Sequence, residues 1–150
     1  MSIRYTHTNI IAKDWRSLAE FYVQVFGCKL VLPERDLSGK WIDRLTNFDG
    51  CSIKGAHLEL PGYEMGPTLE IFSYDPEDTA DAAKTINRLG YGHLAFHVDD
   101  VQAMLNKLLE NGGSQYGDLV SQRYADGSLL TVVYACDPEG NIVELQNRKK

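Results

Sequence analysis

Cysteine is scarce in this chain of 150 residues. Only three occur, Cys28, Cys51 and Cys136. They are odd in number, lie far apart and form no Cys-x-x-Cys pair, which argues against a disulfide framework and against a zinc site built from thiolates. We therefore expect three reduced, partly buried thiols in a cytoplasmic protein.

Positive charge and long apolar runs are also lacking. The chain carries 15 Lys and Arg against 21 Asp and Glu, which gives a formal net charge of −6. Nucleic-acid and anionic-membrane binding require a basic face, so neither partner is expected. No apolar run reaches the length of a membrane span, and residues 1–5 lack the charged and apolar blocks of a signal peptide. The length is that of one domain with a core of its own, covering residues 1–150.

What the chain does contain is an internal repeat. The stretch around His93, with Gly92 before it and Asp100 after it, has a counterpart at the start of the chain. The ungapped shift that places His7 on His93 also aligns other identical residues: Tyr5 with Tyr91, Asp14 with Asp100, and Gly27 with Gly113. Two copies at so long a spacing exclude a solenoid and indicate a duplicated module within one domain.

Hydrophobic periodicity predicts the same element order in both copies. In the first module, about residues 1–76, we expect strands at 5–12, 28–32 (stopped by Pro33), 53–60 and 68–74, with a helix capped by Asp14 and Gly27. In the second, about residues 90–147, Asp100 caps a helix that follows the His93 strand, and strands are expected near 129–134 and 142–146, with 116–124 ambiguous. The fold class is thus α+β, with two βαβββ modules. Residues 41–45 fit either a short helix or an irregular lid, and the role of the longer segment 34–66 is open. Residues 77–90 are expected to form a polar connector between the modules, with room for one or two helical turns.

Four polar side chains stand on strands whose other face is apolar. They are His7 and Glu70 in the first module, and His93 and Glu144 in the second. If helices cover the apolar faces, these side chains lie together on the opposite, concave face of the sheet. The order is His on the first strand and Glu on the last strand, twice.

Two imidazoles and two carboxylates form a borderline-hard set of metal ligands. Such a set suits one divalent ion of zinc, nickel, cobalt, iron or manganese better than Ca²⁺ or Cu(I). The alternative is that each side chain merely faces solvent or hydrogen-bonds locally, but their repeated placement favours a metal site. His97 shares the face of His93 and would line the cavity. By the alternation of their strand, His57 and Glu59 are interpreted as solvent-facing.

In these motifs the chain resembles the vicinal oxygen chelate superfamily, also described as glyoxalase/bleomycin-resistance/dioxygenase-like proteins. The resemblance covers nearly the whole chain. It depends on the His7 strand with Leu18–Tyr22 and Phe26–Gly27 after it, on Gly92–Asp100, and on Asp137–Leu145. It implies two modules whose mixed sheets curve around one metal ion and a small-molecule substrate. In many relatives the cavity forms between modules of two chains, which implies a homodimer.

The filled pattern His, Glu, His, Glu is most similar to glyoxalase I. Methylmalonyl-CoA epimerases typically carry an amide at the second ligand position, where Glu70 stands here. Extradiol dioxygenases use two His and one carboxylate, and antibiotic-binding relatives generally lack the metal set. One departure concerns the substrate: Ile11 and Tyr74 occupy positions where bacterial glyoxalases often hold glutathione with Arg and Asn, and Asn9 or Arg123 would have to replace them.

The resemblance implies a lyase or isomerase that moves a proton next to a carbonyl through an enediolate, which the metal stabilises as a Lewis acid. A carboxylate removes the proton and returns it, and such general-base transfer contributes about 10²–10⁴-fold. Glu144 is the first choice for this base, and Glu70 is its partner. Four aromatic side chains are candidates to wall the cavity, with packing in the core as the commoner alternative for each: Trp41, Phe72, Tyr74 and Tyr91. A metabolite- or antibiotic-sequestering protein remains the alternative of a different class.

Overall fold

The computed structural model describes residues 1–80 and 84–150, and it divides the chain into two compact units, Met1–Ala80 and Asp81–Lys150. Each unit holds one sheet and is described by itself. The boundary between these units, after Ala80, lies inside the predicted connector. How they associate into one domain stays a prediction.

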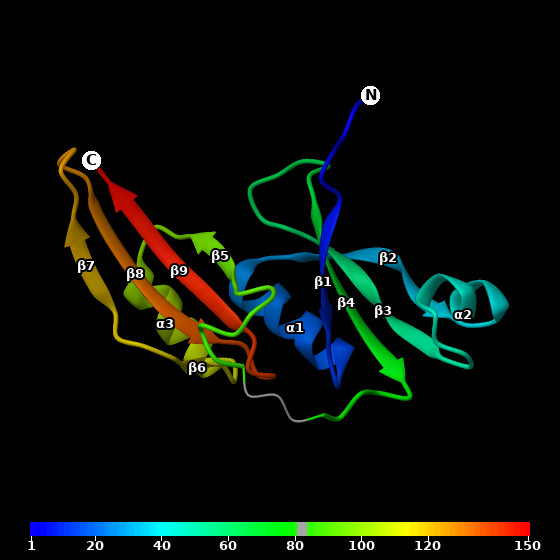
Figure 1. The fold of residues 1–150 in the computed structure, drawn as a ribbon. Helices are drawn as coiled ribbons and strands as arrows, with labels where there is room; N and C mark the ends of the chain where they lie inside the picture. Colours follow the sequence, from blue (N-terminus) through cyan, green and yellow to red (C-terminus); the bar gives the residue numbers. More distant parts are fainter. Residues whose placement is uncertain (81–83) are drawn as a thin grey trace. The chain divides into compact units, whose positions relative to one another are not determined.

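The first unit contains a four-stranded mixed sheet (Figure 1). Its elements are β1 (His7–Ile11), α1 (Trp15–Phe26), β2 (Lys29–Leu37), α2 (Lys40–Thr46), β3 (Ser52–Glu59) and β4 (Thr68–Asp75). The strand order is β1-β4-β3-β2. Strand β1 runs parallel to β4, whereas the other neighbours are antiparallel. The first and last strands of the unit are therefore direct neighbours.

Helix α1 covers one face of this sheet. The Asp14 side chain accepts a hydrogen bond from the Ser17 backbone N–H at its start, and Gly27 ends it in the left-handed conformation with φ 72°. Both caps were predicted, because a short acceptor and a glycine satisfy the free backbone groups of helix ends. Two of its side chains, Tyr22 and Leu18, are fully buried against the sheet, with 0% and 1% exposure. Strand residues that point to the same side are buried as well, namely Ala56, Leu58, Leu69 and Ile71. The opposite face is thereby left for the polar side chains.

Helix α2 packs on that opposite face. Its Ile42 forms a small buried cluster with Cys51 and Ile53, and Phe72 and Tyr74 pack against it. Since side chains alternate along a strand, Phe72 and Tyr74 share the face of Glu70. The segment around residues 41–45 is thus a short helix that covers one end of the polar face.

Pro33 does not end the second strand, contrary to the prediction. Strand β2 continues to Leu37, and its register with β3 shifts between Val31 and Arg35. Proline lacks a backbone donor, and it is tolerated in a sheet at edges and bulges. Strand β2 is an edge strand in the order above and Pro33 lies within the irregularity, so the ladder resumes beyond it.

The second unit repeats this plan. Its elements are β5 (Leu94–His97), α3 (Val101–Glu110), β6 (Ser114–Gln115), β7 (Val120–Arg123), β8 (Leu129–Cys136) and β9 (Ile142–Lys149). The order β5-β9-β8 repeats β1-β4-β3, including the parallel pairing of first and last strands. Where the first unit has the single strand β2, the second has two short ones, β6 and β7, both paired with β8. The α+β class with duplicated modules is confirmed.

The aligned glycines after the two helices serve different purposes. Gly27 is left-handed, but in the second unit Gly112 has this conformation, with φ 94°. A Cβ on Gly113 would lie 2.6 Å from the Cys136 carbonyl oxygen. Gly113 is therefore required by a close backbone approach rather than by its dihedral angle.

The connector between the modules falls partly outside the described residues, at 81–83. Its described parts, 77–80 and 84–90, contain turns and irregular backbone without a helix. Among the helices that the structure describes, none is long and apolar enough to cross a membrane.

Candidate metal centre

His7 and Glu70 come together in the first unit, as predicted. The register of the parallel strands places Asn9 opposite Glu70 and His7 opposite Thr68, so His7 lies diagonal to Glu70 on the same face. The distance from His7 Nε2 to Glu70 Oε1 is 3.5 Å. Neighbouring strands thus join two residues that are far apart in the sequence.

A third residue, His57, also joins this site, although its strand pattern predicted that it faces solvent. His57 lies opposite Glu70 in the β3–β4 ladder, and its Nε2 atom is 2.7 Å from Glu70 Oε2. Its Nδ1 atom hydrogen-bonds Thr68 Oγ1 at 2.7 Å. Alternation correctly separated His57 from the buried Ala56 and Leu58. The error was to equate the opposite face with solvent, when that face holds the polar site.

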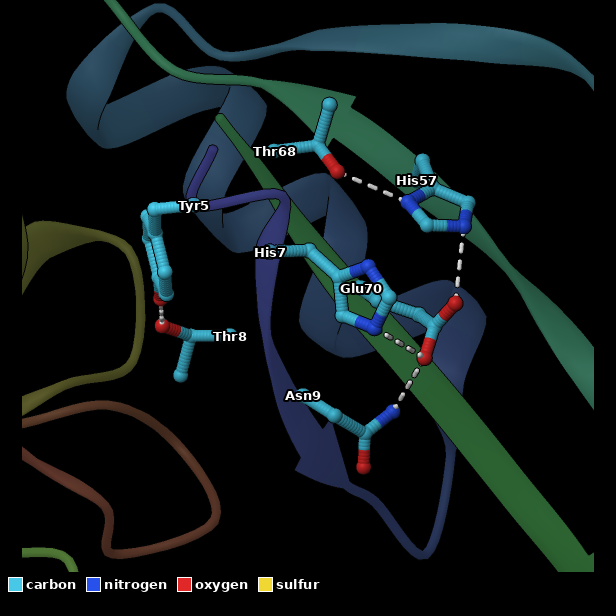
Figure 2. Close-up of polar contacts among 7 residues, drawn as sticks. All are labelled: Tyr5, His7, Thr8, Asn9, His57, Thr68 and Glu70. Carbon is cyan, nitrogen blue, oxygen red and sulfur yellow. Dashed lines mark hydrogen bonds and ion pairs between the residues drawn. The ribbon is translucent and has the colours of Figure 1, made fainter. Parts of the chain in front are cut away.

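Three side chains thus hold the Glu70 carboxylate (Figure 2). Besides the two histidines, Asn9 Nδ2 donates a hydrogen bond to Oε1 at 2.9 Å. Only 9% of Glu70 is exposed. Asn9, which the sequence offered as a substitute for a glutathione-binding residue, thus contacts Glu70 within the site.

Burial and charge act together on His57. The pKa of its imidazole is lowered, first by burial, against the attraction of Glu70, and further by the positive charges of His7 and Arg35. A lower pKa favours the neutral ring, which is the form of histidine that binds metal ions.

The first unit offers a suitable set of metal ligands. It consists of His7, His57 and Glu70. Each of them offers one ligand atom, and these three atoms all lie within 4.8 Å of one another. The rings of His7 and His57 are nearly perpendicular, with centroids 5.2 Å apart. Imidazole and carboxylate donors suit zinc and the other divalent transition metals, so these residues fit the predicted ion.

The second unit brings His93 and Glu144 together. The distance from His93 Nε2 to Glu144 Oε2 is 2.9 Å, and the His93 ring meets Tyr134 edge to face with centroids 5.0 Å apart. Tyr134 lies directly opposite Glu144 in the β8–β9 ladder. Glu144 is flanked by Val143 and Leu145, both fully buried on the helix side. His93 directly precedes β5, so this pair occupies the same places as His7 and Glu70 in the first unit.

The other residues that were considered for the cavity have other contacts or are exposed. Phe72 and Tyr74 belong to the apolar cluster under α2. Trp41 is 58% exposed and Tyr91 is fully exposed within the described structure. His97 is exposed and lies opposite Gln146. Arg123 donates to the Gly127 carbonyl oxygen in the β7–β8 hairpin.

A pocket of about 290 Å³ adjoins His57 in the first unit. Its lining residues come from the segment before β1, from β2 and β3, and from the turn before β4 and the first residue of β4: Arg4, Tyr5, Thr6, Val31, Arg35, His57, Met65, Gly66, Pro67 and Thr68. His57 and Thr68 thus belong both to this pocket and to the group of contacts around Glu70.

Comparison with known proteins finds a family model and several curated relatives. The family model described as "Glyoxalase/Bleomycin resistance protein/Dioxygenase superfamily" matches residues 4–145. A lactoylglutathione lyase of Schizosaccharomyces pombe is 26% identical over 98% of this chain, which spans about half (48%) of that enzyme. A probable lactoylglutathione lyase of Vibrio cholerae is 26% identical, with 98% of this chain and 92% of that protein covered. A 2-epi-5-epi-valiolone epimerase of an Actinomyces species is 29% identical, with 94% and 77% covered.

Solved structures show the same fold. The crystal structure of a glyoxalase family protein from Bacillus cereus matches with a TM-score of 0.83 at 21% identity, covering 100% of this chain and 97% of that one. A lactoylglutathione lyase from Agrobacterium tumefaciens matches with a TM-score of 0.53 at 23% identity, covering 98% and 95%.

Proposed function

The chain belongs to the glyoxalase/bleomycin resistance protein/dioxygenase superfamily, and from this membership we propose that it is a metal-dependent lyase or isomerase of the glyoxalase I type. Its reaction would move a proton between carbons next to a carbonyl group. The observation that carries this proposal is the His–Glu pair at the same two places in each unit, His7 with Glu70 and His93 with Glu144.

These two pairs are the proposed metal ligands. Each pair joins the first and the last strand of its unit, and family membership supports their meeting at one divalent ion. When bound, the ion would supply Lewis-acid stabilisation of negative charge on the substrate oxygens. We propose that His57 is a positioning residue: its Nδ1 atom is fixed by Thr68, and its Nε2 atom holds the Glu70 carboxylate.

Glu144 is the proposed proton carrier. Glu70 is fixed by His7, His57 and Asn9, whereas the described residues give Glu144 one such contact, with His93. A carboxylate with fewer fixed partners can turn toward a substrate carbon more readily, take its proton and return it to the same or the adjacent carbon. Glu70 would stay in place beside the imidazoles.

Solvent deuterium exchange tests this assignment. The wild-type protein, loaded with Ni²⁺ or Zn²⁺, is expected to exchange the carbon-bound proton of its substrate, and Glu144→Gln is expected to lose this exchange by about 10²-fold or more. The candidates are the methylglyoxal–glutathione adduct, 2-methyl acyl-CoA thioesters and polyhydroxy cyclic ketones. Glu59→Gln, at an exposed position on β3, is the matched control and should retain full exchange. Full exchange in Glu144→Gln, with its fold intact by circular dichroism, would remove Glu144 as the base.

Epimerisation is the second candidate function. It is favoured by the 29% identical epimerase and by Ile11 and Tyr74, which replace expected glutathione-binding residues. An epimerase returns the proton to the carbon that lost it, whereas a glyoxalase delivers it to the neighbouring carbon. The position of deuterium in the product, read by NMR, separates the two reactions. Oxygen consumption with catechols would instead indicate a dioxygenase, and tight drug binding without metal would indicate sequestration.

A further inference from the structure

The pocket beside His57 contains two arginines and no acidic residue. Arg4 lies in the segment before β1, and Arg35 lies on β2, yet both line the same space of about 290 Å³. The net charge of the whole chain is −6. This pocket is therefore a local positive site on an acidic protein.

The carboxylates of Glu34 and Glu70 are engaged by other residues. Glu34 is held by Arg16, with two nitrogen–oxygen distances of 2.7 and 2.8 Å. Glu70 is held by its histidine and asparagine partners. Within residues 1–80 and 84–150, no carboxylate lies within 4 Å of Arg4 or Arg35. Both guanidinium groups are thus available to an external anion, and guanidinium groups bind carboxylate and phosphate oxygens through paired hydrogen bonds.

The pocket adjoins the site around Glu70, because His57 belongs to both. The β2–β3 register places Val31 opposite His57 and Arg35 opposite Gly55. Gly55 and His57 are two residues apart on β3 and so share a face, and His57 lies opposite Glu70. Arg35 therefore stands on the same face of the sheet as His57 and Glu70. His57 lines the pocket while its Nε2 atom lies 2.7 Å from Glu70. We expect a substrate whose oxygens approach Glu70 to extend past His57 toward the arginines.

We propose that Arg4 and Arg35 form a subsite for an anionic group of the substrate, a carboxylate or a phosphate. This inference deepens the proposed function, since it names the substrate class of the same site: a small carbonyl compound that carries a negatively charged group at its far end. The volume is at the lower end of the range for small-molecule pockets, which suits a short acid or one end of a larger molecule rather than a whole tripeptide conjugate. Val31, Met65 and Pro67 would contact its carbon chain.

Matched pairs of 2-oxo acids test the subsite by binding, measured by calorimetry on the Ni²⁺-loaded protein. 2-Oxoglutarate and 2-oxoadipate are compared with 2-oxopentanoate and 2-oxohexanoate, which have the same chain lengths and the same chelating end but lack the far carboxylate. At least one dicarboxylate is expected to bind about tenfold or more tightly than its monocarboxylate partner. Arg4→Gln and Arg35→Gln should each reduce this ratio, whereas Arg44→Gln, on the exposed side of α2, should not.

The outcomes distinguish failure of the subsite from failure of the proposed function. Equal binding of both members of each pair overturns the subsite, and if that binding requires the metal, the metal site stands. If the protein holds no metal, the proposed function fails, and inorganic phosphate is then titrated into the metal-free protein. Phosphate binding that is lost in Arg4→Gln and Arg35→Gln supports the subsite, and its absence overturns it. Thermal melts of each variant verify that the fold is retained.

Discussion

Gly55 shows how a single residue without a side chain shapes the polar face. It lies on β3 directly opposite Phe72. A Cβ added there would lie 2.0 Å from the Ile71 carbonyl oxygen and 2.6 Å from Phe72 Cδ1. Such contacts cannot be relieved by turning one flexible side chain, because one of the atoms belongs to the backbone.

Gly55→Ala is therefore expected to destabilise the protein by about 3 kcal/mol, the upper part of the range for overpacked sites. Urea unfolding measures the change. The control is Gly117→Ala, at a position where nothing lies within 4 Å of the added atom. A loss in Gly55→Ala no larger than in the control would mean that β3 and β4 are not packed this closely.

The three cysteines provide a second test at this scale. All are buried, with 1–9% exposure, and burial raises the pKa of the Cys28 thiol to about 11. A thiol with this pKa is only about 0.1% thiolate at pH 8, and the thiolate is the reactive form. With Ellman's reagent at pH 8 we expect the folded protein to react at least about 100-fold more slowly than the denatured one, which should expose three thiols. Rapid reaction of one thiol in the folded state would contradict this burial.

At the scale of elements, aspartate caps explain where α1 and α3 begin. The Asp14 side chain accepts from the Ser17 N–H at 3.0 Å, and Asp100 accepts from the Ala103 N–H at 2.9 Å. Both aspartates were predicted, because an acceptor directly before an amphipathic run is a local signal that does not depend on the rest of the fold.

Asp14→Ala should cost about 1 kcal/mol of stability at pH 7. The hydrogen bond from Ser17 is the main cause that lowers the pKa of Asp14 in the folded protein. A lowered pKa means that the contribution is present above the pKa of an unfolded aspartate and is lost as the pH falls through the folded pKa. The difference from wild type should therefore shrink toward pH 3, as measured by urea unfolding. Asp118→Ala, in an exposed loop, should show neither effect.

What the sequence could not predict at this scale depends on long-range pairing. Alternation showed which face of each strand is apolar, and so it correctly placed His7 and Glu70 on the face away from α1, and Glu144 on the face away from α3. It could not show that His57 pairs with Glu70, because that depends on the register of β3 against β4. The continuation of β2 beyond Pro33 and the short strand β6 likewise depend on neighbouring strands.

For the whole molecule, the duplication places a histidine on the first strand and a glutamate on the last strand of each unit. The parallel pairing of those strands, β1 with β4 and β5 with β9, then brings His and Glu together without any sequence proximity. The pairs were predictable because the repeat was visible. Their meeting at one ion remains a prediction, and so does the homodimer that the family resemblance implies.

The predicted dimer can be tested directly. Light scattering coupled to size-exclusion chromatography is expected to give twice the chain mass of 16.8 kDa. If the two pairs meet at an ion between chains, removal of the metal should weaken the dimer as well as lower its melting temperature, since a ligand stabilises only the state that binds it. A monomer at all concentrations, with metal bound, would contradict the dimer and leave the ligands within one chain.

Metal stoichiometry in single-residue variants tests the central claim most directly. Elemental analysis and calorimetry with Ni²⁺ should find one ion per chain in the wild type. A large loss of affinity is expected in both His7→Gln and His93→Gln, and a smaller one in His57→Gln, which would lose only the contact that holds Glu70. Unchanged affinity in His93→Gln, together with complete loss in His57→Gln, would show that His7, His57 and Glu70 bind the metal alone, and would contradict a site shared by the two units.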